Sequence, residues 1–178
     1  MNRRTRRTSG LIIVLAIATA ALTGCAWMGY TAYIGSWTMT SEQDDGSGGV
    51  MVVSETFSLA QGSYTNTLHL TFEDDSEQEQ RLRGELLVIG HTMTFTVRDI
   101  SFDETTMLLY ELLFAFAGET FALSGQEWMD VDEFIAEMAR IGMELSRDDV
   151  EIGTATFEIS DGVLSLIGDD WEGDYARQ

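Results

Sequence analysis

The stretch that decides the fold runs from residue 50 to residue 72 and reads VMVVSETFSLAQGSYTNTLHLTF. In both halves apolar side chains recur at every second position, and Ser and Thr fill most positions between them. A period of two is that of a β-strand with one face in a core and the other in water. A short glycine-containing turn joins the halves, so the stretch predicts a β-hairpin. Its core-facing residues are Met51, Val53, Phe57, Leu59, Tyr64, Asn66, Leu68, Leu70 and Phe72.

The regions on either side of this stretch repeat the pattern. Residues 82–89 and 92–102 are separated by a two-residue turn, and so are residues 154–160 and 163–167. Runs rich in Thr, Val, Phe and Leu between glycine and acidic turns are typical of an antiparallel sheet. With a first strand from residue 34 onward, the chain predicts a mainly β fold built from consecutive hairpins.

One of these strands changes its pattern in the middle. Between residues 92 and 102 the apolar set switches from odd-numbered to even-numbered positions. The switch would turn side chains to the wrong face unless the strand carries an extra residue. We therefore predict a β-bulge at Arg98-Asp99. The two apolar sets are Met93, Phe95 and Val97, then Ile100 and Phe102.

Residues 107–117 form an almost wholly apolar run, which fits either a buried helix or a strand buried on both faces. Because residues 120–123 alternate again directly after a glycine, we predict a third hairpin at this point.

The period then becomes helical. Ser124 and Glu127, three residues apart, have the spacing of a capping box. We predict one amphipathic helix over residues 126–146, packed against the outside of the sheet. Its apolar residues at helical spacing are Trp128, Val131, Phe134, Ile135, Met138, Ile141 and Leu145.

The start of the chain has the layout of an export signal. Four arginines without an acid precede an apolar run over residues 11–22, and small residues follow. The run is about a dozen residues long, whereas a membrane-spanning helix needs about 20. We therefore expect residues 1–24 to be a signal peptide and residues 25–33 to be a tether.

Leu22-Thr23-Gly24-Cys25 holds the only cysteine of the chain and resembles the lipobox of bacterial lipoproteins. The resemblance implies that the Cys25 thiol receives a diacylglyceryl group and that cleavage falls between Gly24 and Cys25. The new amino terminus is then free for a further acyl chain such as palmitate, and two or three chains hold a protein firmly at a membrane. We expect a lipid-anchored protein of the cell envelope, at the outer membrane or cell surface.

Composition limits the folded part to one domain. Removal of residues 1–24 leaves 154 residues, a common single-domain size, and we place the domain at residues 34–178. The signal takes four of the ten basic residues, so six basic residues face thirty acidic ones and the net charge is −24. Because nucleic-acid binding depends on neutralising phosphates with Lys and Arg, this charge excludes nucleic acid as a partner.

The chain contains neither lysine nor proline, and every basic residue is an arginine. An acid-rich, lysine-poor composition resembles that of proteins from salt-adapted organisms, whose self-repulsion is screened by salt. The alternative is an acidic surface that binds a basic protein or calcium. The acids are spread along the whole chain, which favours salt adaptation.

Gly35-Ser36-Trp37 opens the first strand and resembles the Gly-x-Trp motif of lipocalins and calycins. The resemblance implies an antiparallel up-and-down lipocalin-like β-barrel of about eight strands, with Trp37 closing its floor. It also implies an arginine packed on the tryptophan, for which Arg98 and Arg177 are the candidates. In lipocalins the helix follows the last barrel strand, whereas the helix expected here precedes the last hairpin.

No pattern in the chain indicates catalysis or a metal. His69 and His91 are the only histidines, and no further ligand stands at a zinc-binding spacing. The acidic tail at residues 169–174 lacks the alternation of a calcium loop, so we expect it to be solvated. A Gly-x-Ser-x-Gly nucleophile motif is absent. We expect a non-enzyme with no cofactor and no metal.

Two classes of function stay open. In the first, the barrel holds a small apolar ligand among aromatic side chains, as the lipocalin resemblance implies and as small barrels permit. In the second, the interior is packed and the acidic outer surface binds a basic protein, as in small barrel lipoproteins that inhibit lysozyme. Inward aromatics also serve simply as core. The candidate ligand-binding residues are Trp37, Phe57, Tyr64, Phe95 and Phe157.

Overall fold

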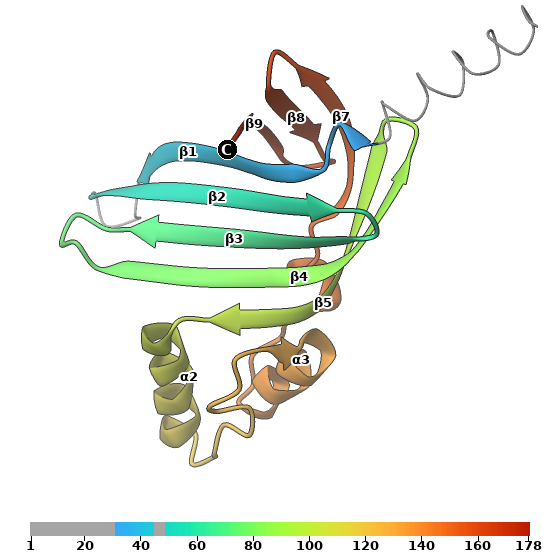
Figure 1. Ribbon diagram of the computed structural model, residues 1–178. Helices are drawn as coiled ribbons and strands as arrows, with labels where there is room; N and C mark the ends of the chain where they lie inside the picture. Colours follow the sequence, from blue (N-terminus) through green and yellow to red (C-terminus); the bar gives the residue numbers. More distant parts are fainter. Residues whose placement is uncertain (1–30, 45–48) are drawn as a thin grey trace, which may run out of the picture. The chain divides into compact units, whose positions relative to one another are not determined.

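The computed structural model describes residues 31–44 and 49–178. The chain divides into two compact units, and the second, Ile34–Gln178, carries the β-fold drawn in Figure 1. The signal peptide expected at residues 1–24 and the lipobox cysteine Cys25 lie outside the described residues.

Eight antiparallel strands close into a barrel. Each strand pairs with the next one along the chain, and the last pairs back with the first through Trp37–Arg177 and Thr38–Ala176. The prediction of a mainly β, up-and-down lipocalin-like barrel of about eight strands is therefore confirmed. The barrel strands are β1 (Gly35–Asp44), β2 (Val50–Ala60), β3 (Ser63–Thr71), β4 (Glu77–Ile89), β5 (Thr92–Phe102), β7 (Gly153–Ser160), β8 (Val163–Ile167) and β9 (Glu172–Arg177).

The predicted hairpins 50–72, 82–102 and 154–167 are confirmed as β2–β3, β4–β5 and β7–β8. Turn chemistry explains why they form at these places. Asp161 and Gly162 have φ of 52° and 80°, the left-handed pair of a type I′ turn, whose twist matches the flanking strands. Gly62 in the β2–β3 turn also has a φ of 80°. The turns set the register that keeps the apolar face of each strand inside the barrel.

The predicted bulge is confirmed. Gly84 pairs with Val97 while Arg83 pairs with Asp99, so Arg98 is the extra residue on β5. At Gly84 the backbones of β4 and β5 approach so closely that a Cβ would lie 1.9 Å from the carbonyl oxygen of Thr96. A glycine is needed here because no side chain fits.

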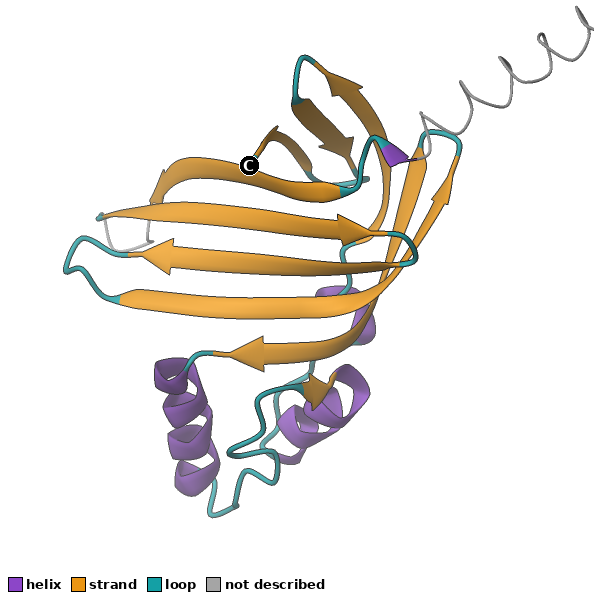
Figure 2. Cartoon of the chain, viewed as in Figure 1, coloured by secondary structure: helices purple, strands orange, loops and turns teal. Residues whose placement is uncertain are grey.

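The bulge divides β5 into two halves, and on the edge away from β4 each half pairs with a different strand. Its first half pairs with β7, and its second half pairs with the two-residue strand β6 (Met129–Asp130). Because β6 lies outside the barrel circuit, the segment between β5 and β7 leaves the barrel wall here. That segment carries both helices, which lie together on one side of the barrel in Figures 1 and 2.

The third hairpin, predicted at residues 107–123, is wrong. Residues Glu104–Phe116 form the helix α2, which begins at the N-cap Asp103. The Asp103 side chain accepts a hydrogen bond from the Thr106 backbone at 2.7 Å, and it also accepts one from the Glu79 backbone on β4. These bonds lower the pKa of Asp103, although partial burial acts against them. An aspartate that caps a helix and ties it to the sheet favours a helix over a strand.

The predicted amphipathic helix exists but is shorter than residues 126–146. Helix α3 spans Val131–Arg140, and Asp130 is its N-cap, accepting from the backbones of Asp132 at 2.9 Å and Glu133 at 3.2 Å. Ser124, which was expected to form the cap, donates instead to Glu111 on α2. Gly142 has a φ of 82° just beyond the helix, and the short 3₁₀ helix η1 (Arg147–Asp149) follows. Val131, Phe134 and Met138 are buried, so the predicted apolar face is the packed face.

The expectation that residues 169–174 form a solvated tail is also wrong. Strand β9 begins at Glu172 and completes the barrel by pairing with β8 and β1. Its acids are exposed to solvent, and Tyr175 is its one buried side chain. A strand with a single apolar inward residue lacks the alternation by which a strand is recognised in a sequence.

Candidate functional site

Trp37 lies at the end of the barrel where β9 meets β1, and it is 0% exposed. The guanidinium carbon of Arg177 lies 5.4 Å from the centre of its ring, and Arg177 also donates to the Ile34 carbonyl at 3.2 Å. Arg98, the other candidate, is paired with Glu85 on the surface instead. Arg177 is thus the arginine that packs on the tryptophan.

The next three candidates join Trp37 in one aromatic cluster. Phe57 is the cross-strand partner of Trp37 on the same face. The ring centroids of Phe57 and Phe95 are 5.4 Å apart, and those of Tyr64 and Phe95 are 5.1 Å apart in an edge-on arrangement. All four side chains are buried. The structure therefore brings them together as packed core.

Phe157 lies elsewhere. It is partly exposed, and its ring centroid is 6.0 Å from that of His91 in the β4–β5 turn. Its backbone N–H donates to the His91 carbonyl at 2.8 Å. The five residues grouped on sequence grounds thus divide into a cluster of four and one residue near the barrel's edge.

A cavity of about 340 Å³ lies directly beside this cluster. Phe57 and Tyr175 form its floor, with their ring centroids 5.2 Å apart and nearly perpendicular. One wall is the indole of Trp171, which donates to the Ile152 carbonyl at 3.3 Å and packs on Gly168. We call this space the mouth cavity. Its lining comes from β1 and β2 (Met39, Glu55, Phe57), the loop before β7 (Glu151, Ile152), and the β8–β9 turn with β9 (Trp171, Glu172, Tyr175).

Glu55 is the polar centre of the mouth cavity. It lies on the inward face of β2, between the buried residues Val53 and Phe57, and is itself only half-buried. Its carboxylate accepts hydrogen bonds from the Tyr175 hydroxyl at 2.6 Å and from the Asn66 amide at 2.8 Å. Both donors are neutral. Among the described residues no cationic side chain lies within ion-pair distance of Glu55.

Glu151, on the opposite wall, is in a different state. The Arg147 guanidinium binds it at 2.9 Å. The same arginine pairs with Asp132 on α3 and donates to the Val97 carbonyl at 2.6 Å, so it ties the helical segment to β5. Glu151 therefore has a cationic partner, which it shares with Asp132, whereas Glu55 has none among the described residues.

Two buried tyrosines near these acids both have a raised pKa but differ in whether the hydroxyl has a hydrogen-bond partner. Burial, and then the charge and hydrogen bond of Glu55, raise the pKa of Tyr175 above its usual value. Burial and the nearby charge of Glu151 likewise raise the pKa of Tyr64. The Tyr64 hydroxyl is buried without a hydrogen-bond partner, whereas the Tyr175 hydroxyl donates to Glu55. The buried hydroxyl at the mouth cavity is thus hydrogen-bonded, whereas the one at Tyr64 is not.

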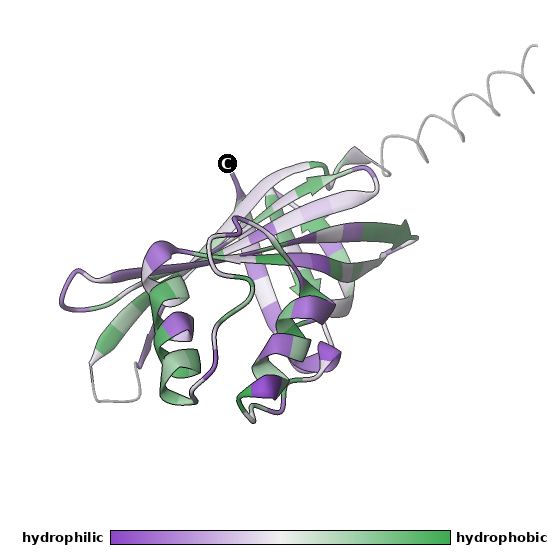
Figure 3. Ribbon diagram, turned by 90° about the horizontal axis from the view of Figure 1, so that it is seen from below, coloured by the Kyte–Doolittle hydropathy of each residue, from purple (hydrophilic) through white to green (hydrophobic). Residues whose placement is uncertain are grey.

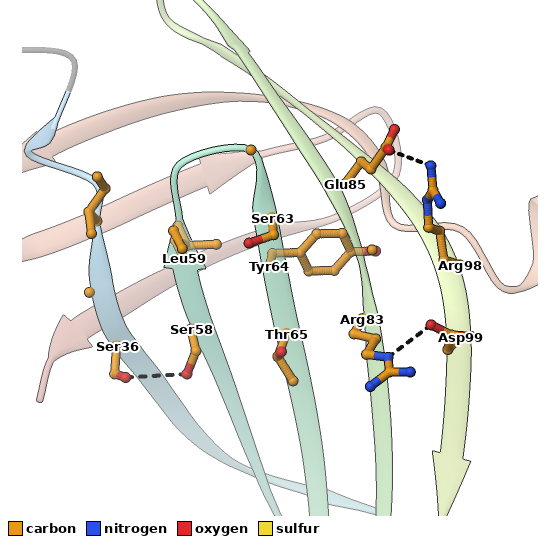
Figure 4. Close-up of a pocket in the computed structure, with 15 residues that line it drawn as sticks. Ser36, Ser58, Leu59, Ser63, Tyr64, Thr65, Arg83, Glu85, Arg98 and Asp99 are labelled. Atoms are coloured by element: carbon orange, nitrogen blue, oxygen red, sulfur yellow. Dashed lines mark hydrogen bonds and ion pairs between the residues drawn. The ribbon is translucent and has the colours of Figure 1, made fainter. Parts of the chain in front are cut away.

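A larger hollow, about 730 Å³, lies at the other end of these strands over the bulge (Figure 4). Its charged side chains are paired with one another. Ser36 and Ser58 are hydrogen-bonded at 3.2 Å, Arg83 binds Asp99 at 2.8 Å, and Arg98 pairs with Glu85. In Figure 4 the Tyr64 ring extends from β3 toward β4, where its cross-strand partner is Gly84. With its charges satisfied, this hollow offers little to a ligand.

The histidines do not form a site with their neighbours. His69 lies on the outer face of β3, 3.8 Å from Glu77 and 4.0 Å from Glu79. His91 lies in a turn beside Phe157. Over residues 31–44 and 49–178, no three His, Cys, Asp or Glu side chains are grouped so that they could hold a metal ion.

Helix α2 presents an unusual surface. Its buried face, with Phe114 at 0% exposure, packs on Phe121 at a centroid distance of 4.9 Å. Its opposite face is also apolar, with four leucines 45–54% exposed and a terminal phenylalanine 89% exposed. Figure 3 shows the helix with mainly hydrophobic bands. Within the described part of the chain no helix is long and apolar enough to cross a membrane. The exposed residues are Leu108, Leu109, Leu112, Leu113 and Phe116.

Sequence reasoning found Phe57 but missed the rest of the mouth cavity. The signal for Glu55 and Asn66 was present, because each interrupts the apolar positions of its strand with a polar residue on the core-facing side. Two polar residues on the inner faces of adjacent strands indicate a polar spot inside the barrel. Trp171 and Tyr175 carried no such signal, since their segment resembled an acidic tail.

In comparisons with known proteins, no family model and no curated protein matches the chain.

Proposed function

We propose that the protein is a lipid-anchored lipoprotein of the cell envelope whose barrel binds a small molecule in the mouth cavity, without catalysing a reaction. One observation carries the ligand-binding part: beside a fully packed aromatic cluster, the same barrel keeps a 340 Å³ space lined by aromatic rings and a hydrogen-bonded carboxylate. Ligand sites in proteins are mainly apolar spaces of about 300–1,000 Å³ with a few placed polar groups. The mouth cavity has this composition and size.

The proposed site differs from the one that the sequence suggested. The four clustered candidates are packed on one another, so the ligand lies beside Phe57 rather than among Trp37, Tyr64 and Phe95. Phe57 belongs to both, because it packs in the cluster and, with Tyr175, forms the floor of the cavity. A non-catalytic role is favoured because the hydroxyl of the lining that lies beside a carboxylate, that of Tyr175, holds its proton tightly: burial, and then the charge and hydrogen bond of Glu55, raise the pKa of Tyr175.

Retention of a ligand is the direct test. Ile152→Trp should fill the mouth cavity from its loop wall, and the matched control Ile167→Trp adds the same bulk at an exposed position of β8. Native mass spectrometry of the chain purified from its own cells should show an added small-molecule mass on the parent and on I167W. The mass should be absent from I152W. An added mass retained by I152W would place the ligand elsewhere, and no added mass on any form would count against ligand binding.

The envelope address rests on the lipobox resemblance and has its own test. Cys25→Ser removes the only thiol that can be acylated. The parent should partition into detergent and sediment with membranes, and C25S should move to the soluble fraction. Membrane association of C25S equal to that of the parent would contradict the anchor.

A second candidate function, a protein-binding module, is favoured by the exposed apolar face of α2. Monomeric proteins seldom leave a contiguous apolar surface of this kind without a use. The surrounding domain is strongly acidic, so the matching partner has an apolar patch bordered by basic residues. The apolar helix, rather than the acidic surface alone, then provides the contact.

Lysozyme can serve as the basic probe protein for this second candidate. Leu109→Ser with Leu112→Ser should abolish its binding in calorimetry, whereas Leu87→Ser with Ile89→Ser, two exposed apolar residues of β4, should leave it unchanged. Equal binding by both double variants would exclude α2 as the contact surface. The absence of lysozyme binding by the parent would remove this candidate for lysozyme-like partners.

A further inference from the structure

We propose that the ligand of the mouth cavity is a small organic cation with an apolar body, such as an alkylated ammonium compound. This inference rests on the proposed ligand-binding function and adds the charge and class of the ligand.

The Glu55 carboxylate lacks a counter-charge among the described residues. A carboxylate inside a barrel is stabilised by hydrogen bonds and by a counter-charge. Glu55 has two hydrogen bonds, from Tyr175 and Asn66, but no cationic partner among the residues that the structure describes. Its neighbour across the cavity, Glu151, already has Arg147. The lining therefore has one inner carboxylate whose counter-ion is missing, and a bound cation would supply it.

The lining of the mouth cavity is rich in aromatic rings. Phe57, Tyr175 and Trp171 all border the same space. Aromatic faces attract cations through their quadrupoles, and Trp does so most strongly. Quaternary ammonium groups are recognised in proteins by cages of such aromatic rings. The rings that would pack on an apolar body therefore also favour a positive charge next to Glu55.

The charge and the size of the mouth cavity disfavour anions and long acyl chains. Glu172 lies at the rim and, like Glu55, has no ion pair within the described part of the chain. An anion such as a fatty acid would bring its charge between two carboxylates, where like charges repel. A long acyl chain also exceeds a space of about 340 Å³ that ends at packed rings. Size and charge together select a short cationic molecule over a lipid anion.

Three probes with the same alkyl chain test the inference: hexyltrimethylammonium, hexanol and hexanoate. The protein is the full-length chain carrying Cys25→Ser, so that lipid and detergent do not compete for the probes. Calorimetric titration should give at least a tenfold tighter Kd for the cation than for hexanol, and hexanoate should bind more weakly than hexanol. Raising the salt concentration should weaken the cation's binding and leave that of hexanol unchanged.

Glu55→Gln removes the charge while the side-chain oxygen keeps its place as an acceptor. This variant should lose the preference for the cation and bind hexanol as the parent does. Glu158→Gln, an exposed outward-facing acid of β7, makes the same change in net charge and should keep the preference. Because the three-probe comparison is made on the unsubstituted cavity, it holds even if E55Q fails to fold.

The outcomes separate this inference from the function on which it rests. Binding of hexanol as tight as that of the cation, or a preference that survives in E55Q, would overturn the cation assignment and leave ligand binding intact. Tighter binding of hexanoate would overturn it as well. If none of the three probes binds, both the inference and the proposed ligand-binding function fail for ligands of this size.

Discussion

Two halves of one barrel interior, built on the same strands with the same alternation, have different properties. Around Trp37, Phe57 and Phe95 the rings pack on one another and exclude solvent. Only two residues along β2, at Glu55, the inward side chain is charged and the space beside it stays open. The strand pairing continues through both halves, so the difference comes from the side chains. The backbone of the barrel is one structure, whereas its interior serves stability in one half and recognition in the other.

The largest effect on the packed half should come from Trp37→Ala. Loss of a fully buried large aromatic costs about 3–5 kcal/mol of unfolding free energy, which can unfold a domain of ordinary stability. Phe157→Ala, at a partly exposed position outside the cluster, is the control and should cost clearly less. Chemical denaturation measures both. A W37A variant as stable as F157A would show that the packed half is not the main core.

The close approach at the bulge should be nearly as sensitive. Gly84→Ala puts a methyl group 1.9 Å from the Thr96 carbonyl oxygen, so β4 and β5 must separate. Overpacking of this kind costs about 1–3 kcal/mol, and a backbone contact lies at the upper end. Gly90→Ala is a useful comparison, because its strain comes from a φ of 61° alone and no atom lies within 4 Å of the added carbon. Denaturation midpoints should rank parent, G90A, then G84A, and the reverse order would contradict the close approach.

A pair of tyrosine variants sharpens the comparison between the halves. Tyr175→Phe removes the hydroxyl that donates to Glu55 and should cost about 1.5–3 kcal/mol, since the bond involves a carboxylate. Tyr64→Phe removes a buried hydroxyl that has no partner and should leave stability unchanged or raise it by about 1 kcal/mol. Equal losses for both variants, in the same denaturation assay, would show that the Tyr64 hydroxyl has a partner too.

The same tyrosines predict a loss of stability in alkali. Their pKa values are raised in the folded state, so the neutral form is favoured by folding. This contribution is fully present below the ordinary tyrosine pKa of about 10 and declines as the pH rises above it. The slope of stability against pH above 10 should be shallower in Y175F than in the parent. An unchanged slope would mean that Tyr175 does not contribute.

The smallest effect on stability per side chain should come from the exposed acids of the outer surface. Thirty acids face ten basic residues in the chain, and the repulsion between exposed carboxylates is screened once the Debye length falls to about 3 Å near 1 M salt. The melting temperature should rise steadily as sodium chloride increases to molar levels. A flat or falling curve would favour an acidic surface kept for a specific partner over salt adaptation.

The sequence was most informative where one strand face is core and the other is water. The hairpin at residues 50–72 could be recognised because its alternation and its turn agree, and the bulge at Arg98 could be located from a change of parity alone. Both features depend on neighbours in the chain. Local patterns therefore sufficed for most of the barrel wall.

The sequence was least informative where a segment is apolar or polar on both faces. Helix α2 is apolar on most of its surface, so no period distinguished it from a buried strand, and the local evidence was limited to its N-cap Asp103 and to Gly118 just past its end. Strand β9 could not be recognised for the opposite reason: it is mostly polar, and Tyr175 is its one inward apolar residue. The mouth cavity combines Glu55 with residues about 120 positions away in that strand, a proximity that only the closed barrel creates.

The most direct test of the division between the two halves is a crystal structure of the domain with (6-bromohexyl)trimethylammonium. Anomalous scattering from bromine locates the chain of this probe without reference to any side chain. We predict one bromine site in the mouth cavity, with the ammonium group next to Glu55 and Trp171 and no site among Trp37, Tyr64 and Phe95. An empty mouth cavity, or bromine within the aromatic cluster, would contradict the account.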